Sequence, residues 1–205
     1  MNLAEELALL AYDDSGAARV GQPALGYGLA GALLAELALA GRVDVVDRRV
    51  AVLDPTPPQE PAVRAVLARI AADKPRKPKW WVAKLSKGLT TQVLDGLVGA
   101  GVLRREKGRV LWVFPRTRYP SPGGREPEAE TEARGRLVAA VTGDGPVEPR
   151  TAALGALVRA VRYDRQVFPD LPRSRVRTRL KEFSEGDWAA TAVRKAIEEH
   201  QAATG

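Results

Sequence analysis

The stretch ALGYGLAGALLAELALA, residues 24–40, decides the fold of this chain. It is apolar on every side, and Glu36 is its only charged residue. A helix that is hydrophobic all round is either buried in a protein or crosses a membrane. A membrane span needs about 20 strongly apolar residues. Much of this stretch is Ala and Gly, which add little transfer energy but let neighbouring helices approach closely. We therefore predict a buried central helix that ends at Gly41.

Helical patterns flank this stretch on both sides. Asn2 and Glu5 form a capping-box pattern, after which apolar residues recur at helical spacing as far as Ala11. Further helical stripes are expected at about 63–70, 80–87, 90–100, 128–141, 150–161, 174–183 and 186–200. The later stripes are narrow, so we expect them to pack on the first half of the chain. The prediction is an all-α fold, a mainly helical single domain over residues 1–205, with a linker-like loop at 120–127.

Two segments have the pattern of short β-hairpins. Residues 42–53 alternate, are rich in Val and are expected to turn near Asp47 and Arg48. In residues 102–114 we place the turn at 106–109 (EKGR) and the returning strand at 110–114. That strand is a continuous apolar run, so we expect something apolar to cover one of its faces.

The composition restricts the class of protein. There is no cysteine among the 205 residues, which excludes disulfides and thiolate chemistry and fits a reducing compartment. Glu5 and Glu6 stand where a signal peptide would carry basic residues, so we expect a cytoplasmic protein. The window 73–109 contains ten basic and three acidic residues, which accounts for the whole formal charge of +7. A solvated charge run is the ordinary explanation. Such segregation instead favours a polyanionic partner, either nucleic acid or an anionic membrane.

The basic stretch KPRKPKWWVAKLSK, residues 74–87, is the main candidate site. Its prolines exclude a regular helix over 74–79, so we expect an exposed basic loop that leads into a short helix. Tryptophan beside lysine suits a membrane interface, where the ring lies at headgroup depth and the ammonium group meets phosphate. The alternative is that Trp81 packs inward with Leu85 and only Trp80 is exposed. The candidate lipid-binding residues are Lys74, Arg76, Lys77, Lys79, Trp80, Lys84 and Lys87.

The sequence contains no pattern typical of catalysis or metal binding. The only histidine, His200, lies near the end of the chain, and the acidic residues show no paired spacing. Gly26, Gly28 and Gly31 lie in a helical run, not in a phosphate-binding loop after a strand. We therefore predict that the protein is not an enzyme and needs no cofactor and no metal.

A helix at 90–100 followed by a basic hairpin also has the order of elements found in winged-helix DNA-binding proteins. Basic residues on the hairpin would suit phosphates. However, residues 89–102 contain no Arg or Lys, and a helix without basic residues is a poor reader of a DNA groove. Nucleic-acid binding is therefore the second hypothesis.

Two ordered sets of motifs resemble the Golgi phosphoprotein 3 family. The first is LAEELALL at 3–10, followed by GLAGALLAELAL at 28–39 and GRV at 41–43. The second is LV at 97–98 and GVL at 101–103, followed by the hairpin and RYP at 118–120. The similarity is strong up to about residue 120, and the lack of a basic N-terminal tail resembles the compact bacterial members. The resemblance implies a mostly helical domain that binds the cytosolic face of a membrane. Eukaryotic relatives recognise phosphatidylinositol 4-phosphate and act as adaptors that retain Golgi glycosyltransferases.

The resemblance also implies roles for particular residues. The apolar hairpin of the family is linked to self-association, so the candidate membrane or oligomer contacts here are Leu111, Trp112, Val113 and Phe114. The lipid pocket of the family uses a Trp and an Arg around the start of the central helix and basic residues on a later helix. The corresponding places hold Gly21, Ala30 and residues 90–92 (TTQ), none of which is basic or aromatic.

We therefore predict a peripheral membrane protein that binds anionic phospholipid, inositol lipid included, through the basic stretch. At roughly 1 kcal/mol for each basic residue near an anionic surface, a few engaged residues give reversible, salt-sensitive attachment. The further partners that the resemblance implies are the tails of membrane proteins and a second copy of the chain.

Overall fold

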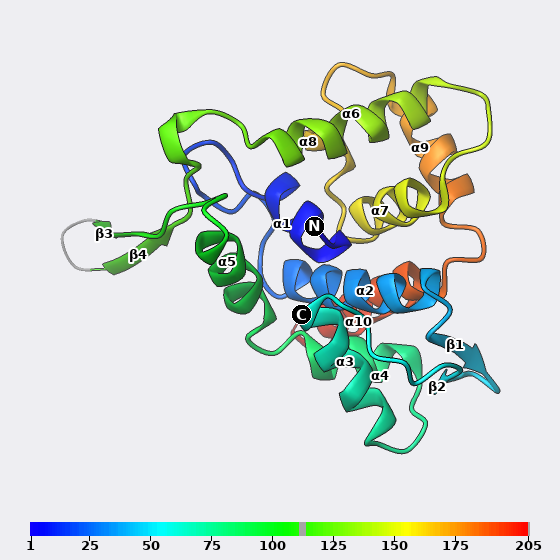
Figure 1. Ribbon diagram of the computed structural model, residues 1–205. Helices are drawn as coiled ribbons and strands as arrows, with labels where there is room; N and C mark the ends of the chain where they lie inside the picture. The colour runs from blue at the N-terminus through cyan, green and yellow to red at the C-terminus, as the bar shows by residue number, and fades with distance from the viewer. Residues whose placement is uncertain (111–113, 205) are drawn as a thin grey trace.

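Helix α2 (Ala24–Leu39) runs through the middle of the molecule, as predicted (Figure 1). This computed structural model describes the backbone of residues 1–110 and 114–204, and their side chains except those of 109, 110, 114–116 and 204. Residues on every side of α2 are buried, from Leu25 to Leu37. The helix ends at Leu39, and Gly41 stops it as predicted, with a φ of 67° in the left-handed region that suits glycine.

Helices from both halves of the chain surround α2. Those in contact with it are α1 (Leu3–Leu10), α3 (Pro61–Ala71), α4 (Pro78–Leu85), α5 (Leu89–Gly99), α7 (Pro149–Ala160) and α10 (Trp188–Thr204). An outer set packs on α7 instead: α6 (Glu128–Thr142), α8 (Asp164–Val167) and α9 (Arg173–Phe183). A short 3₁₀ turn, Pro122–Gly124, lies in the predicted loop. The all-α, mainly helical single-domain fold is confirmed, and the buried apolar residues of both halves form one cluster.

Small residues on α2 allow the close packing that its composition predicted. A Cβ on Gly31 would lie 2.2 Å from Cγ2 of Val193 in α10, and one on Gly28 would lie 2.6 Å from Cγ1 of Val161. These distances are far below normal carbon–carbon contact. The two glycines therefore set how near the second half of the chain approaches the central helix.

A partly buried ionic network also joins the two halves. Arg150 of α7 contacts the carboxylates of Glu6 in α1 and Glu36 in α2, and Arg136 of α6 lies 2.8 Å from Glu6. Glu36 also accepts a hydrogen bond from the backbone N–H of Leu3. The only charged residue of the predicted central helix thus lies at a junction of three helices.

The first predicted hairpin is confirmed, whereas the second has a different register. Strands β1 (Val43–Val46) and β2 (Arg49–Val52) turn at Asp47 and Arg48, both with positive φ, as a type I′ turn requires. The second hairpin pairs β3 (Glu106–Val110) with β4 (Phe114–Arg118), so the turn predicted at 106–109 was wrong. The base of this hairpin is fixed by hydrogen bonds from Arg104 N–H to Pro120 and from Tyr119 N–H to Gly16. These distant contacts override the local turn preference of Lys-Gly.

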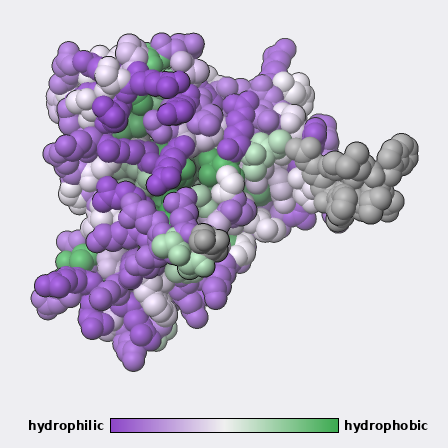
Figure 2. Space-filling model, turned by 180° about the vertical axis from the view of Figure 1, so that it is seen from behind, coloured by the Kyte–Doolittle hydropathy of each residue, from purple (hydrophilic) through white to green (hydrophobic). Residues whose placement is uncertain are grey.

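Seen from behind, the surface is mostly hydrophilic, and apolar residues show only in limited areas (Figure 2). Among the described residues, no helix has both the length and the apolar character needed to cross a bilayer.

Candidate functional site

The basic segment, residues 74–87, is held against the β1–β2 hairpin. The backbone N–H of Val50 donates to the carbonyl of Arg76 at 2.8 Å, and the Arg49 guanidinium donates to the carbonyl of Pro75 at 2.9 Å. Lys74 and Lys77 are exposed, whereas Arg76 is half-buried and lies 3.6 Å from the carboxylate of Asp73. The predicted exposed loop is therefore a fixed turn with exposed lysines.

Helix α4 begins at Pro78, two residues earlier than the sequence indicated. Proline has no N–H to lose at the first position of a helix, and its fixed φ suits that position. The prolines therefore exclude helix before residue 78 but not from it. As a result, Lys79 lies inside α4, where it forms an ion pair with Glu199 of α10.

The two tryptophans of α4 have different environments, which decides between the alternatives left by the sequence. Trp81 is buried together with Leu85, and Trp80 is half-buried. The guanidinium of Arg76 lies 4.8 Å from the Trp80 ring centre and the ammonium of Lys84 lies 5.8 Å from it. Both distances are within the range of cation–π attraction. Trp80 therefore lies beside two cations and packs edge-on against Trp81, with ring centres 4.9 Å apart.

Most lysines of the basic segment have no acidic partner. Within the described residues, the side chains of Lys74, Lys77, Lys84 and Lys87 form no ion pair, and all four are exposed. Their charge is not neutralised by the fold, so it is available to an external anion. Of the predicted cations, the structure places Arg76 and Lys84 beside the half-buried Trp80 ring.

The second basic group lies elsewhere, on the β3–β4 hairpin that projects to the left in Figure 1, while the turn before α4 lies at the bottom. Arg105 forms an ion pair with Asp95 of α5 and lies 5.8 Å from the ring centre of Tyr119. Leu111, Trp112 and Val113 lie outside the described residues, and Phe114 opens β4 with an undescribed side chain. Their role in membrane or oligomer contact therefore stays a prediction.

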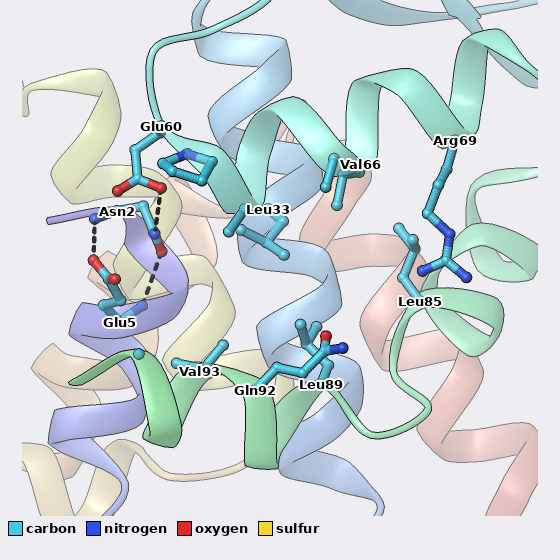
Figure 3. Close-up of a pocket in the computed structure, with 14 residues that line it drawn as sticks. Asn2, Glu5, Leu33, Glu60, Val66, Arg69, Leu85, Leu89, Gln92 and Val93 are labelled. Atoms are coloured by element: carbon cyan, nitrogen blue, oxygen red, sulfur yellow. Dashed lines mark hydrogen bonds between the residues drawn. The ribbon is translucent and has the colours of Figure 1, made fainter. Parts of the chain in front are cut away.

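A groove of about 340 Å³ adjoins the end of α4 and is lined by α2, α3, α5 and the N-terminal residues. Its floor is apolar, with Leu33, Val66, Leu89 and other aliphatic residues (Figure 3). Asn2, Glu5 and Glu60 form a hydrogen-bonded group at one end, and Arg69 lies at the other (Figure 3). The sequence did not indicate this groove, because its walls come from segments far apart in the chain.

A family model described as Golgi phosphoprotein 3 (GPP34) matches residues 3–200. The chain belongs to the Golgi phosphoprotein 3 family. No curated protein matched this chain.

The resemblance assigned the family's lipid pocket to Gly21, Ala30 and residues 90–92, and the structure brings the first and the last of these places together. The side-chain amide of Gln22, next to Gly21, donates to the hydroxyl of Thr90 at 3.1 Å. The start of α2 therefore contacts the start of α5, although Ala30 is fully buried. Gln22 and Thr90 are neutral, whereas Arg19 and Arg162 line the hollow that contains Gly21 and Gln22.

Proposed function

We propose that this protein binds anionic phospholipid membranes peripherally, through Trp80 and the exposed lysines of the basic segment. The observation that carries the proposal is the half-buried Trp80 ring with Arg76 and Lys84 beside it, in a segment whose lysines other than Lys79 have no acidic partner among the described residues. An indole ring next to ammonium groups suits the headgroup layer, where one part is apolar and the other meets phosphate. Membership of the Golgi phosphoprotein 3 family supports the same function.

The expected attachment is reversible and depends on salt. Each lysine near an anionic surface contributes about 1 kcal/mol, so four engaged lysines contribute roughly 4 kcal/mol. Salt screens this attraction because the Debye length falls from about 10 Å at 0.1 M to about 3 Å at 1 M. Trp80 adds an apolar contribution that salt does not weaken.

Co-sedimentation with vesicles tests the proposal. The variant Lys74→Gln/Lys77→Gln/Lys84→Gln should lose most binding to phosphatidylglycerol vesicles. The control Arg165→Gln/Arg173→Gln/Arg177→Gln removes the same charge from exposed positions on α8 and α9 and should bind almost as the wild type does. Equal loss in both variants would show that only net charge matters and would reject the basic segment as the site.

Salt dependence should distinguish the contribution of Trp80 to vesicle binding from that of the lysines. Trp80→Ala should weaken binding at every salt concentration without changing the slope of affinity against salt, whereas the lysine variant should flatten that slope. If Trp80→Ala binds as tightly as the wild type at high salt, the ring does not enter the headgroup layer.

The headgroup preference follows from the same experiment. At matched total charge, we expect vesicles with phosphatidylinositol 4-phosphate to bind no better than those with phosphatidylglycerol, because the places of the family pocket are neutral here. A strong preference for the inositol phosphate would show a specific site.

Duplex DNA serves as competitor. We expect it to compete poorly, because the exposed side of α5 presents Asp95 and no basic residue.

An adaptor role for membrane-protein tails is the second candidate function. The groove in Figure 3 favours it, because an apolar floor with carboxylates at one end suits a short peptide with an apolar and a basic side chain. Ala65→Arg would fill the groove, whereas Ala68→Arg on the same helix adds the same charge outside it. Binding of a labelled Leu- and Arg-containing peptide should be lost only in the first variant.

A further inference from the structure

A cavity of about 420 Å³ lies between the C-terminal ends of α7 and α9 and the middle of α10. No residue of the basic segment lines it. Small residues, Ala, Ser and Thr, form part of its wall. Its charged lining residues are Arg159, Arg162, Lys181, Arg194, Glu185 and Glu198. Four basic and two acidic side chains give this wall a net positive charge.

Arg159, in the last turn of α7, has a guanidinium group without an acceptor. Its Nη1 atom is buried and makes no hydrogen bond, and the side chain forms no ion pair with any residue that the structure describes. A buried donor that leaves water without finding an acceptor is costly, and such groups in native proteins call for a missing partner. Arg159 lines the adjacent cavity, so an anion bound there would meet this guanidinium group.

Arg162, which lines the cavity, has an unusual backbone conformation. It follows the last residues of α7 with φ of 59°, in the left-handed region where this chain places glycine after α2 and α5, at Gly41 and Gly101. A non-glycine residue here is strained, and strain of this kind concentrates at functional sites. The backbone N–H groups of Arg162 and Tyr163 donate to the carbonyls of Arg159 and Val158 and close the end of α7, while the exposed Arg162 side chain makes no ion pair with a described residue.

The other charged groups leave room for a ligand with two negative charges. Lys181 forms no ion pair among the described residues, and the nearest contact between Arg194 and Glu198 is 4.0 Å, at the limit of an ion pair. Glu185 and Glu198 are both exposed. If Glu198 balances Arg194, then Arg159, Arg162 and Lys181 carry three positive charges, and Glu185 is the one lining carboxylate left to balance them.

We propose that this cavity binds a phosphate monoester, carried by a small molecule or by a lipid headgroup. Arginine forms paired hydrogen bonds to phosphate oxygens through its planar fork, and a monoester carries nearly two negative charges at pH 7. Arg159 and Arg162 hold the phosphate, and Lys181 balances the second charge. This site is independent of membrane attachment by the basic segment.

Isothermal titration of the intact protein with glycerol 3-phosphate tests the soluble form of the ligand. We expect saturable binding that Arg162→Gly weakens at least about tenfold, the size expected when one charge-assisted hydrogen bond is lost. Glycine suits the left-handed position, so this variant should fold at least as well as the wild type. The control Arg173→Gln removes an exposed charge of α9 outside the cavity and should leave binding unchanged.

A vesicle arm identifies a lipid source. Vesicles with phosphatidic acid, a monoester, are compared at matched charge with phosphatidylglycerol, a diester. A preference for phosphatidic acid that Arg162→Gly and Arg159→Gln both abolish supports a lipid headgroup, even if glycerol 3-phosphate does not bind. The lysine variant of the basic segment separates the two proposals, because it should lose phosphatidylglycerol binding and keep glycerol 3-phosphate binding.

Two results would overturn the proposal. One is the absence of both saturable glycerol 3-phosphate binding and a preference for phosphatidic acid. The other is binding that the cavity variants leave intact or that Arg173→Gln weakens equally.

Discussion

Packing between α2 and α10 depends on the absence of a side chain at Gly31, and Gly31→Ala tests this directly. In an open helix, replacing Gly by Ala stabilises a protein by about 0.4–1 kcal/mol. At Gly31, the new Cβ would lie 2.2 Å from Cγ2 of Val193 and 3.1 Å from Cδ2 of Leu157. Val193 is fully buried, and a β-branched side chain in a helix has essentially one χ1 rotamer. The methyl group therefore cannot swing aside, and the helices must separate.

The two opposing effects can be compared in magnitude. Overpacking a dense core costs about 1–3 kcal/mol, occasionally more, and a contact this short belongs at the upper end. After the gain in helix propensity is subtracted, Gly31→Ala should lower the free energy of unfolding by about 2 kcal/mol. For a chain of this length, that corresponds to a fall of roughly 4–8 °C in Tm.

Urea unfolding followed by circular dichroism measures this effect, and Gly96→Ala provides the matched control. Gly96 also lies inside a helix, α5, but a Cβ there would meet nothing within 4 Å, so that variant should be more stable than the wild type. In the Gly31→Ala background, Val193→Ala should destabilise far less than it does alone, because it removes the clash. If Gly31→Ala stabilises as much as Gly96→Ala, the close approach of α2 and α10 is refuted.

Three further changes test other parts of the fold. Arg150→Met should lower the free energy of unfolding by about 3 kcal/mol in urea titrations, because the partly buried Glu36 loses its ion pair and the buried Glu6 keeps only Arg136; little change would mean that water solvates both carboxylates. Burial and the nearby Glu126, opposed by Arg134, raise the pKa of Glu130 to about 7. Its ionised form therefore destabilises the fold above that pH, and the penalty falls as the pH drops towards the ordinary pKa of about 4.3. From about pH 8 to about pH 5.5, the wild type should gain stability relative to Glu130→Gln; parallel curves would contradict the raised pKa. Arg48→Gly should raise Tm, because glycine adopts the left-handed conformation at the β1–β2 turn without the cost of about 1 kcal/mol that a residue with a Cβ carries; an unchanged Tm would show that this turn is not strained.

Features that depend on neighbours in the chain were predictable from the sequence. Asn2 accepts hydrogen bonds from the N–H groups of Ala4 and Glu5 at 3.0 Å, and Glu5 accepts one from the N–H of Asn2, as the capping-box pattern indicated. The turn at Asp47 and Arg48 was likewise visible, because its partners lie within a few residues. The sequence also predicted the burial of α2, since a helix with no polar side has no other stable place in a soluble fold.

The candidate sites were only partly predictable. The sequence indicated the cations around Trp80 because they lie within one short segment. It could not decide whether both tryptophans face outward or Trp81 packs inward, since only the packed neighbours fix the rotation of the helix. It also placed the second hairpin's turn wrongly, because distant hydrogen bonds at Gly16 and Pro120 set that register.

Sequence alone thus determined the helical class, the buried central helix and the family resemblance, all of which rest on local patterns. Tertiary structure alone decided which charges meet. Arg150 reaches Glu6 and Glu36 across more than a hundred residues, and the Arg159–Arg162 cavity closes only when α9 and α10 pack against α7. The physical reason is range: hydrophobic periodicity acts over one helical turn, whereas an ion pair or a cavity needs segments that only the folded chain brings together.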